Sequence, residues 1–372
     1  MLDDFGQRIR DIILSEMDLS RELSDEEICD LIGSVVSREA RDRPMTIKDR
    51  AELERTIFNS LRKLDVLQEL VDDRDVTEIM VNGPNDIFYE KAGRIQRFKG
   101  HFSSEEKLED VIQQIVGRHN RVVNQASPIV DTRLSDGSRV NIVLNPISIG
   151  GSAVSIRKFP EHPMSMERLV EIEALSSEVA RLLQILTQAK YNIFISGGTG
   201  SGKTTFLNAL SQYIPDDERI ITIEDSAELQ LLGAKNIVRL ETRNANTDGV
   251  TPITIRDLIR TALRMRPDRI IVGECRGAEA LDMLQAMNTG HDGSLSTGHA
   301  NSPHDIISRI ETMVLQGQDF PLNAIRQQIA SGIDIIVQLG RLRDKSRRVL
   351  EISEVDGFMD CLLYTSPSPR DA

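Results

Sequence analysis

The stretch GGTGSGKT at residues 197–204 constrains this chain more than any other part of its sequence. It matches the phosphate-binding loop (P-loop) pattern G-x-x-x-x-G-K-[ST], and it lies between an apolar run typical of a buried strand and a run typical of a helix. In that context glycines let backbone N–H groups face phosphate oxygens, Lys203 reaches the β- and γ-phosphates, and the Thr204 hydroxyl binds Mg²⁺. The predicted nucleotide-binding residues are Gly197, Gly198, Thr199, Gly200, Ser201, Gly202, Lys203, Thr204 and Thr205.

Length and composition indicate a globular protein with two domains. The chain has 372 residues, of which 40% are hydrophobic and 28% are charged. These values are ordinary for soluble domains of about 100 to 200 residues each. No apolar run approaches the roughly 18 residues that span a bilayer, and the start MLDDFGQRIRDIIL lacks the plan of a secretory signal. We therefore expect a cytoplasmic protein.

Charge and cysteine usage argue against several classes of function. The formal net charge is −13, which opposes binding to nucleic acid, because that affinity comes largely from Lys and Arg. We therefore expect no direct nucleic-acid partner. Cys29, Cys275 and Cys361 form no C-x-x-C pair and have no metal-ligand spacing, which favours a reducing compartment.

Hydrophobic periodicity divides the chain before residue 361 into four expected segments. Helical spacing over 1–62 predicts a small helical segment, which either packs on its neighbour or docks a partner. Short strand patterns around one helix predict a mixed α+β domain over 63–158. Two prolines in 159–165 predict a linker, and alternating strand and helix patterns over 166–360 predict a mainly parallel sheet flanked by helices.

Carboxylates follow two further apolar strand patterns. Hydrolysis of a nucleotide needs a carboxylate beside the P-loop to position Mg²⁺ or to activate water. Glu224, Asp225 and Glu228 come at the end of the run RIITIE, and Glu274 follows RIIVG. The carboxyl end of a strand in a parallel sheet lies at the crevice where nucleotides bind. The alternatives are a helix N-terminal cap for the first group and a purely structural role for Glu274.

Two histidines, His291 and His299, flank a Gly-, Ser- and Thr-rich run in GHDGSLSTGHA. Either could be a hydrogen-bonded structural residue or half of a metal pair, although no further Cys or His stands at ligand spacing. The remaining interpretation is a histidine that hydrogen-bonds the γ-phosphate and responds to its loss.

Taken in order, these motifs resemble those of the secretion ATPase superfamily of type II secretion, type IV secretion and type IV pili. More closely, the chain looks like the CpaF/TadA branch, which powers Flp (Tad) pilus assembly. The resemblance rests on three long stretches, DVTEIMVNG at 75–83, DTRLSDGSR at 131–139 and ALRMRPDRIIVGE at 262–274. It implies a RecA-like motor domain that hydrolyses ATP with Mg²⁺ and works as a homo-hexamer, peripheral to the inner membrane through platform proteins.

The resemblance also implies roles for individual residues. Glu274 would be the general base for hydrolysis. Glu224 would help to hold Mg²⁺ or water, with Asp225 in the same acidic box. His299 and His291 would contact the γ-phosphate or the neighbouring subunit.

In this family, arginines of the preceding domain complete the site. Arg139 and Arg157 stand at matching positions, as does Arg133. An arginine that reaches the γ-phosphate from another domain couples domain closure to the triphosphate; the alternative is a surface ion pair. Members often carry an apolar residue where this chain has Gly298, so we expect a slightly looser strand before His299.

Three functions remain open on these grounds. The first is a ring motor for pilus assembly or protein secretion, and type IV secretion ATPases that export effectors or DNA share its motifs. The second is a nucleic-acid-dependent P-loop ATPase, which the charge and the scarcity of aromatic residues for base stacking oppose. The third is a GTPase or a small-molecule kinase, but the guanine motif N-K-x-D is missing from the sequence.

The last segment, 361–372, reads CLLYTSPSPRDA and does not continue the pattern of strands and helices. It resembles translated non-native sequence from a truncated reading frame. We expect this tail to be disordered and Cys361 to carry no function. A packed tail that buries Leu362 and Leu363 would contradict this expectation.

Overall fold

The structure, a computed structural model, describes residues 4–17, 21, 23–42, 45–118, 122–159, 163–243, 251–359 and 362–366. Contacts divide the chain into two compact units, Met1–Glu161 and His162–Ala372. The division falls inside the expected linker 159–165, whose residues 160–162 lie outside the described part. None of the helices in the described part is long and apolar enough to span a membrane.

The first unit begins with three helices, α1 (Asp4–Glu16), α2 (Asp25–Glu39) and α3 (Ile47–Arg62). Ser24 and Thr46 start α2 and α3 with capping boxes, in which side chains satisfy the first backbone N–H groups of a helix. The apolar faces of the three helices form one small core of Ile9, Ile13, Ile28, Ile32, Val35, Val36 and Ile57. The segment expected to be helical therefore buries a core of its own.

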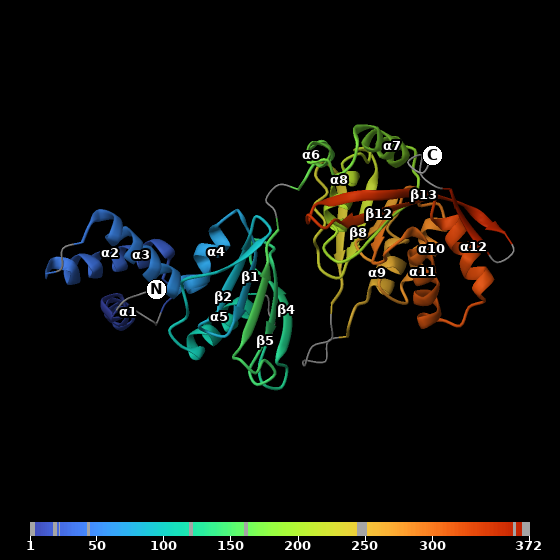
Figure 1. The fold of residues 1–372 in the computed structure, drawn as a ribbon. Helices are drawn as coiled ribbons and strands as arrows, with labels where there is room; N and C mark the ends of the chain where they lie inside the picture. Colours follow the sequence, from blue (N-terminus) through green and yellow to red (C-terminus); the bar gives the residue numbers. More distant parts are fainter. Residues whose placement is uncertain are drawn as a thin grey trace. The chain divides into compact units, whose positions relative to one another are not determined.

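A six-stranded antiparallel sheet forms the rest of this unit, in the order β3-β2-β1-β6-β5-β4 (Figure 1). Helix α5 (Glu105–Gly117) packs its apolar side against one face of the sheet, and the short α4 (Gln68–Asp72) precedes β1. On β5 and β6, the residues that alternate with this core lie on the other face. The strands are β1 (Val76–Asn82), β2 (Ile87–Lys91), β3 (Arg94–Arg97), β4 (Ile129–Arg133), β5 (Arg139–Val143) and β6 (Ala153–Arg157).

The second unit is built on an eight-stranded sheet in the order β14-β13-β12-β7-β11-β10-β8-β9. The run from β12 to β9 is parallel, and β13 and β14 add antiparallel strands at one edge. The prediction of a mainly parallel sheet is confirmed. The strands are β7 (Ile193–Gly197), β8 (Arg219–Glu224), β9 (Asn236–Glu241), β10 (Arg269–Val272), β11 (Leu295–Gly298), β12 (Ile335–Arg341), β13 (Arg347–Met359) and β14 (Leu362–Ser366).

Helices cover both faces of this sheet, as an alternating strand and helix pattern requires. Strand β7 shows the arrangement, because Ile193 and Ile195 belong to one core and Phe194 to the other. A strand buried on both faces reads as a continuous apolar run, which is the signal that the sequence carries before the P-loop. The helices are α6 (Met166–Glu171), α7 (Ser177–Gln188), α8 (Lys203–Ser211), α9 (Ile255–Ala262), α10 (Ala280–Asn288), α11 (Pro303–Gly317) and α12 (Leu322–Gly332).

We expected the tail to be disordered, but five of its residues form a strand. Leu362–Ser366 form β14, which pairs antiparallel with β13. The physical reason is that β13 would otherwise be an open sheet edge, and Leu, Tyr and Thr are strong strand formers. Cys361 and residues 367–372 lie outside the described part of the chain.

A buried ion pair lies at the amino end of β10. Arg269 is fully buried and donates to both carboxylate oxygens of Glu218, and its Nη1 donates to the backbone oxygen of Gly293 at 3.1 Å. Glu218→Ala would leave the guanidinium buried without its carboxylate, so we expect a loss of about 3–5 kcal/mol in the free energy of unfolding, measured by urea denaturation.

The matched control is Asp216→Ala, which breaks the exposed pair between Asp216 and Lys235. Exposed pairs contribute about 0–1 kcal/mol. Equal effects of the two substitutions would contradict the role given to the buried pair.

Candidate active site

The carboxyl ends of four neighbouring strands meet at one edge of the second sheet. Strand β7 ends at Gly197, β11 at Gly298, β10 at Val272 and β8 at Glu224, and the sheet order is β7-β11-β10-β8. Because these strands are parallel, whatever follows each of them lies at the same edge. The P-loop, His299, Glu274 and Glu224 are therefore brought together, although they are far apart in the sequence.

The P-loop joins β7 to α8, and two of its positions favour glycine over any residue with a side chain. A Cβ on Gly197 would lie 2.7 Å from the backbone oxygen of Leu339 on the neighbouring strand β12. Gly202 precedes α8 with φ of +94°, a left-handed conformation that side chains rarely adopt. The first backbone N–H groups of α8 have no partner within the helix, which makes this helix start suited to phosphate oxygens.

Lys203, His299 and Glu274 form a continuous chain of polar contacts. The Lys203 ammonium lies 3.1 Å from the backbone oxygens of Gly197 and Gly198 and 3.1 Å from His299 Nδ1. On the other side of the ring, His299 Nε2 lies 2.7 Å from Glu274 Oε1. An ammonium can only donate, so His299 accepts at Nδ1, and its Nε2 faces the Glu274 carboxylate.

The same contacts keep the imidazole neutral. Burial of the ring and then the nearby Lys203 ammonium lower the pKa of His299, and the Glu274 carboxylate offsets this only in part. Burial likewise lowers the pKa of Lys203.

Glu274 is held as a carboxylate mainly by Arg276. Burial alone would raise the pKa of Glu274, but the hydrogen bond and charge of Arg276, with a smaller contribution from the charge of Lys203, bring it below its usual value. Arg276 Nη2 lies 2.5 Å from Glu274 Oε2. Sequence reasoning missed Arg276; its position two residues after Glu274 is the only signal that the sequence offers.

Glu224 is buried and anchors the turn that follows β8. Its Oε1 accepts the backbone N–H groups of Glu228 and Leu229 at 2.8 and 2.9 Å. The alternative of a helix N-terminal cap is wrong, because residues 225–231 are not helical. Gly273 lets the side chain cross the end of β10, since a Cβ there would lie 2.8 Å from Glu224 Cγ.

Asp225 and Thr204, the other residues predicted to bind Mg²⁺, are less buried than Glu224. Asp225 is half exposed, and its Oδ2 lies 3.9 Å from Arg276 Nη1. Thr204 is half-buried in the first turn of α8. No group of three or more His, Cys, Asp or Glu side chains in the described residues could hold a metal by itself. This donor set fits Mg²⁺, which is usually bound by one or two protein oxygens together with substrate phosphates.

His291 is not brought into this site. It precedes β11, and its Nδ1 lies 3.2 Å from the backbone oxygen of Ala286 near the end of α10. His299 follows β11, so the length of that strand, about 3.3 Å per residue, separates the two histidines. The structure therefore places His291 away from His299 and the P-loop of its own subunit, and its contact with a γ-phosphate or a neighbouring subunit stays a prediction.

Gly298, directly before His299, is closely packed. A Cβ there would lie 2.9 Å from Phe194 Cζ and 3.1 Å from Ile306 Cδ1. The position is buried and pairs with Ser196 of β7. The structure thus differs from the expected looser strand, because the missing side chain makes room for the Phe194 ring.

The three candidate arginines lie in one row across the sheet of the first unit. Arg133 pairs with Arg139, and Arg139 pairs with Arg157, on the face away from the core. Glu78 continues the row on β1, with its Oε1 3.8 Å from Arg157 Nε. The three arginine side chains are thus neighbours on that face of the first unit's sheet, and their contact with a γ-phosphate stays a prediction.

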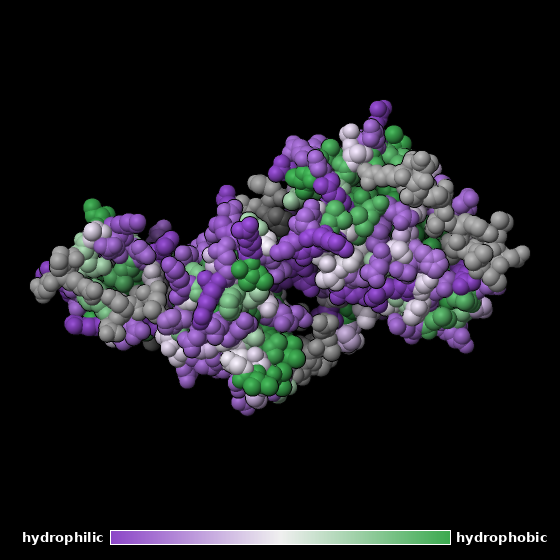
Figure 2. Space-filling view, in the orientation of Figure 1, coloured by the Kyte–Doolittle hydropathy of each residue, from purple (hydrophilic) through white to green (hydrophobic). Residues whose placement is uncertain are grey.

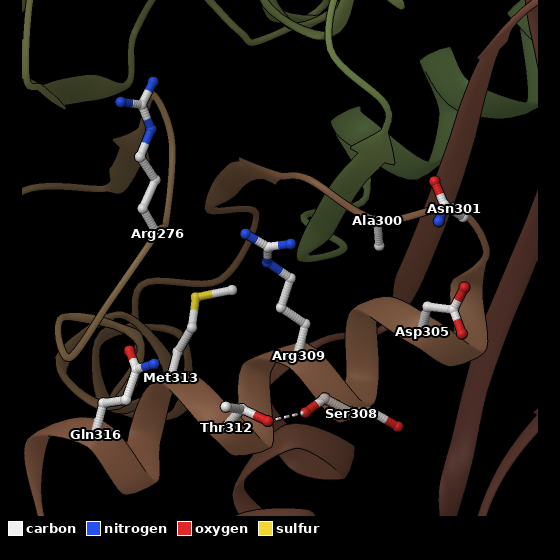
Figure 3. Close-up of a pocket in the computed structure, with 9 residues that line it drawn as sticks. All are labelled: Arg276, Ala300, Asn301, Asp305, Ser308, Arg309, Thr312, Met313 and Gln316. Atoms are coloured by element: carbon white, nitrogen blue, oxygen red, sulfur yellow. Dashed lines mark hydrogen bonds between the residues drawn. The ribbon is translucent and has the colours of Figure 1, made fainter.

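A cavity of about 430 Å³ opens beside the Glu274 loop (Figure 3). Arg276 reaches it from the loop after β10, and Arg309 from α11. Ala300 and Asn301, which follow His299, line the same space. The side of the site beyond Glu274 and His299 is therefore open and carries two guanidinium groups.

The comparisons with known proteins agree with this geometry. The chain matches the family model described as "Type II/IV secretion system protein" over residues 60–364. It is 33% identical over 306 residues to a putative conjugal transfer protein of Mycobacterium tuberculosis, covering 80% of this chain and 86% of that protein. It is also 33% identical over 321 residues to the type IV secretion system protein PtlH of Bordetella pertussis, covering 79% of this chain and 95% of PtlH.

A solved structure has the same fold. The pilus retraction motor PilT, with bound ADP, is 24% identical; the match covers 75% of this chain and 78% of that chain, with a TM-score of 0.58. The predicted fold is confirmed: a mixed α+β domain precedes a RecA-like motor domain along the chain.

The neutral His299 makes a prediction about pH. Its pKa in the folded protein lies below 6.5, the ordinary value of a histidine, so the unfolded chain binds more protons in the interval between the two values. The stability of the wild type should then rise with pH through that interval and level off above 6.5. His299→Gln keeps a polar side chain between Lys203 and Glu274 without titrating, so it should lack this rise.

The measurement is urea denaturation of both proteins from about pH 5.5 to 7.5 at constant ionic strength. Glu274 does not titrate in this pH window, because its pKa lies below 4.5, the ordinary value of a glutamate. Parallel stability curves for the two proteins would contradict the neutral assignment of His299.

Proposed function

Because the chain belongs to the type II/IV secretion system protein family and is a P-loop ATPase, we propose that it couples ATP hydrolysis to mechanical work on a secretion or pilus-assembly machine at the inner membrane. The observation that carries this proposal is the contact chain Lys203–His299–Glu274 beside the P-loop. It supplies a phosphate-binding cation, a γ-phosphate contact and a base within one site.

Each member of the chain has a task in hydrolysis. ATP would draw the Lys203 ammonium away from the loop carbonyls and from His299, because phosphate oxygens are stronger acceptors. Glu274, kept ionised by Arg276, would orient the attacking water and take its proton. Mg²⁺, bound to the Thr204 hydroxyl and the phosphates, would supply positive charge against the charge that develops on the phosphoryl group.

A homo-hexamer is the assembly that we propose for this motor. The arginine row of Arg133, Arg139 and Arg157 supports an anion-binding role for the first unit. An arginine that meets the γ-phosphate would tie the position of that unit to the state of the nucleotide. Hydrolysis would then release the unit, and six copies in a ring could pass this motion to a partner.

For the branch of the family we propose Flp/Tad pilus assembly with inner-membrane platform proteins as partners, which rests on the sequence stretches at 75–83, 131–139 and 262–274. Export by a type IV or conjugal transfer machine is the second candidate, because relatives at 33% identity carry those names. A net charge of −13 argues against direct contact with nucleic acid. Strong stimulation of ATP hydrolysis by single-stranded DNA would favour the alternative of a nucleic-acid-dependent ATPase.

Substitution of Glu274 tests the hydrolytic site. Glu274→Gln keeps the shape of the side chain and removes its basicity, so we expect hydrolysis to fall by about 100-fold or more while ATP still binds. Steady-state phosphate release and titration with a fluorescent ATP analogue measure the two quantities. Lys203→Ala, the control, should lose binding as well. A Glu274→Gln protein that hydrolyses ATP at the wild-type rate would refute this role.

A pair of substitutions tests the arginine row. Arg157 is largely exposed and its ion pair with Glu78 is long, so that pair contributes little. We expect Arg157→Ala to lower the turnover rate by at least about tenfold, as the loss of a phosphate-contacting arginine does. Glu78→Ala removes the same ion pair and spares the arginine, so it should hydrolyse ATP normally. An equal loss of turnover rate in the two variants would show that Arg157 acts only through its surface ion pair with Glu78.

A further inference from the structure

Thr297 contacts the backbone on both sides of Glu274. Its hydroxyl donates to the backbone oxygen of Gly273 at 2.8 Å, and its own backbone oxygen accepts the N–H group of Cys275 at 2.8 Å. Thr297 is the third residue of β11, and its exposed fraction is 1%. One buried residue therefore holds the chain directly before and directly after the carboxylate that is proposed as the base.

Strand β8 holds the same stretch from the opposite side, because β10 lies between β11 and β8 in the sheet. The N–H group of Gly273 donates to the backbone oxygen of Ile223 at 2.8 Å. Gly273 follows Val272, the last residue of β10, so its polar groups lie where that strand ends and need partners of their own. The direction in which the chain leaves β10, and with it the position of Glu274, is therefore set by β8 and β11.

The contact between Glu274 and His299 depends on the same hydrogen bond. His299 lies two residues after Thr297, and its Nε2 is 2.7 Å from Glu274 Oε1. These two side chains come from different strands, so the length of their contact depends on how the loop after β10 is held against β11. A displacement of about 1 Å in a catalytic group can lower a rate by about 100-fold.

A purely structural role for the Thr297 hydroxyl has to be separated from this one. A buried backbone oxygen needs a donor, so the bond to Gly273 also stabilises the fold. Thr222 of β8 offers a comparison, because it is fully buried in the same sheet and its hydroxyl has no hydrogen-bond partner in the described part of the chain. Burial of a threonine in this sheet does not by itself create such a contact.

We propose that Thr297 is a positioning residue for hydrolysis, which acts by holding the backbone around Glu274 at a fixed place relative to His299 and the γ-phosphate. The proposal rests on the proposed ATPase function. It extends the hydrolytic site from the groups that meet the nucleotide to a residue that fixes their spacing. No motif marks Thr297 in the sequence, where it is one of several Ser, Thr and Gly residues between the two histidines.

Removal of the Thr297 hydroxyl is the first test. Thr297→Val keeps the shape of the side chain, and we expect kcat of the full chain with MgATP to fall about tenfold in phosphate-release assays. The affinity for a fluorescent ATP analogue should stay within about twofold of wild type, because the residue does not touch the nucleotide. Thr297→Ser keeps the hydroxyl and should restore kcat to within about threefold of wild type. Thr222→Val, the matched control, should change neither quantity.

A double-mutant cycle with Glu274→Gln separates positioning from a general effect on the fold. If Thr297 acts through Glu274, adding Thr297→Val to Glu274→Gln should lower single-turnover hydrolysis by less than about twofold, because the group that it positions has already lost its basicity. A tenfold loss in that background, at about the single-variant size, would overturn the proposal. A wild-type kcat in Thr297→Val, or an equal loss in Thr222→Val, would overturn it as well.

The outcomes also separate this proposal from the function on which it rests. Binding of the ATP analogue shows that a variant is folded, and Thr297→Ala, which also lacks the hydroxyl, carries the same expectation where Thr297→Val does not fold. A Glu274→Gln protein that hydrolyses ATP at the wild-type rate would overturn the proposed base. A slow Glu274→Gln protein beside a Thr297→Val protein with wild-type kcat would overturn the role of Thr297 alone.

Discussion

Parallel pairing of β7, β11, β10 and β8 is the constraint on which the rest of the second unit depends. It places the carboxyl ends of four strands at one edge, and each strand delivers one part of the site there. Hydrogen-bonded pairing of the strands sets the distances between the P-loop, His299, Glu274 and Glu224, so these groups can be far apart in the sequence. Apolar residues on both faces of these strands then fix the sheet between two cores.

Sequence reasoning was strongest where chemistry requires a motif at fixed spacing. The P-loop is recognisable from its sequence pattern alone. Glu274 and His299 were candidates because each is a polar residue at the end of a strand pattern. Arg276 was missed, because its contact with Glu274 comes from the direction in which its side chain leaves a loop. His291 lies apart from His299 because the run between the two histidines is a strand, and a strand puts its two ends far apart.

Electrostatics distinguishes the site from the rest of the surface. The chain as a whole is strongly acidic, and hydrophilic residues cover much of the visible surface of both units (Figure 2). Against that background, Lys203, Arg276 and Arg309 gather near the P-loop edge, and a separate row of arginines crosses the first sheet. Such local groups of cations give an acidic protein places that can attract an anionic ligand.

The contact between Gly298 and Phe194 has a mechanical consequence. Phe194 belongs to the strand that carries the P-loop, and Gly298 ends the strand that carries His299, so the ring fills the space between the two strand ends. Neither strand can slide past the other without compressing that ring. Close packing at this point therefore couples the position of the phosphate cradle to that of the histidine.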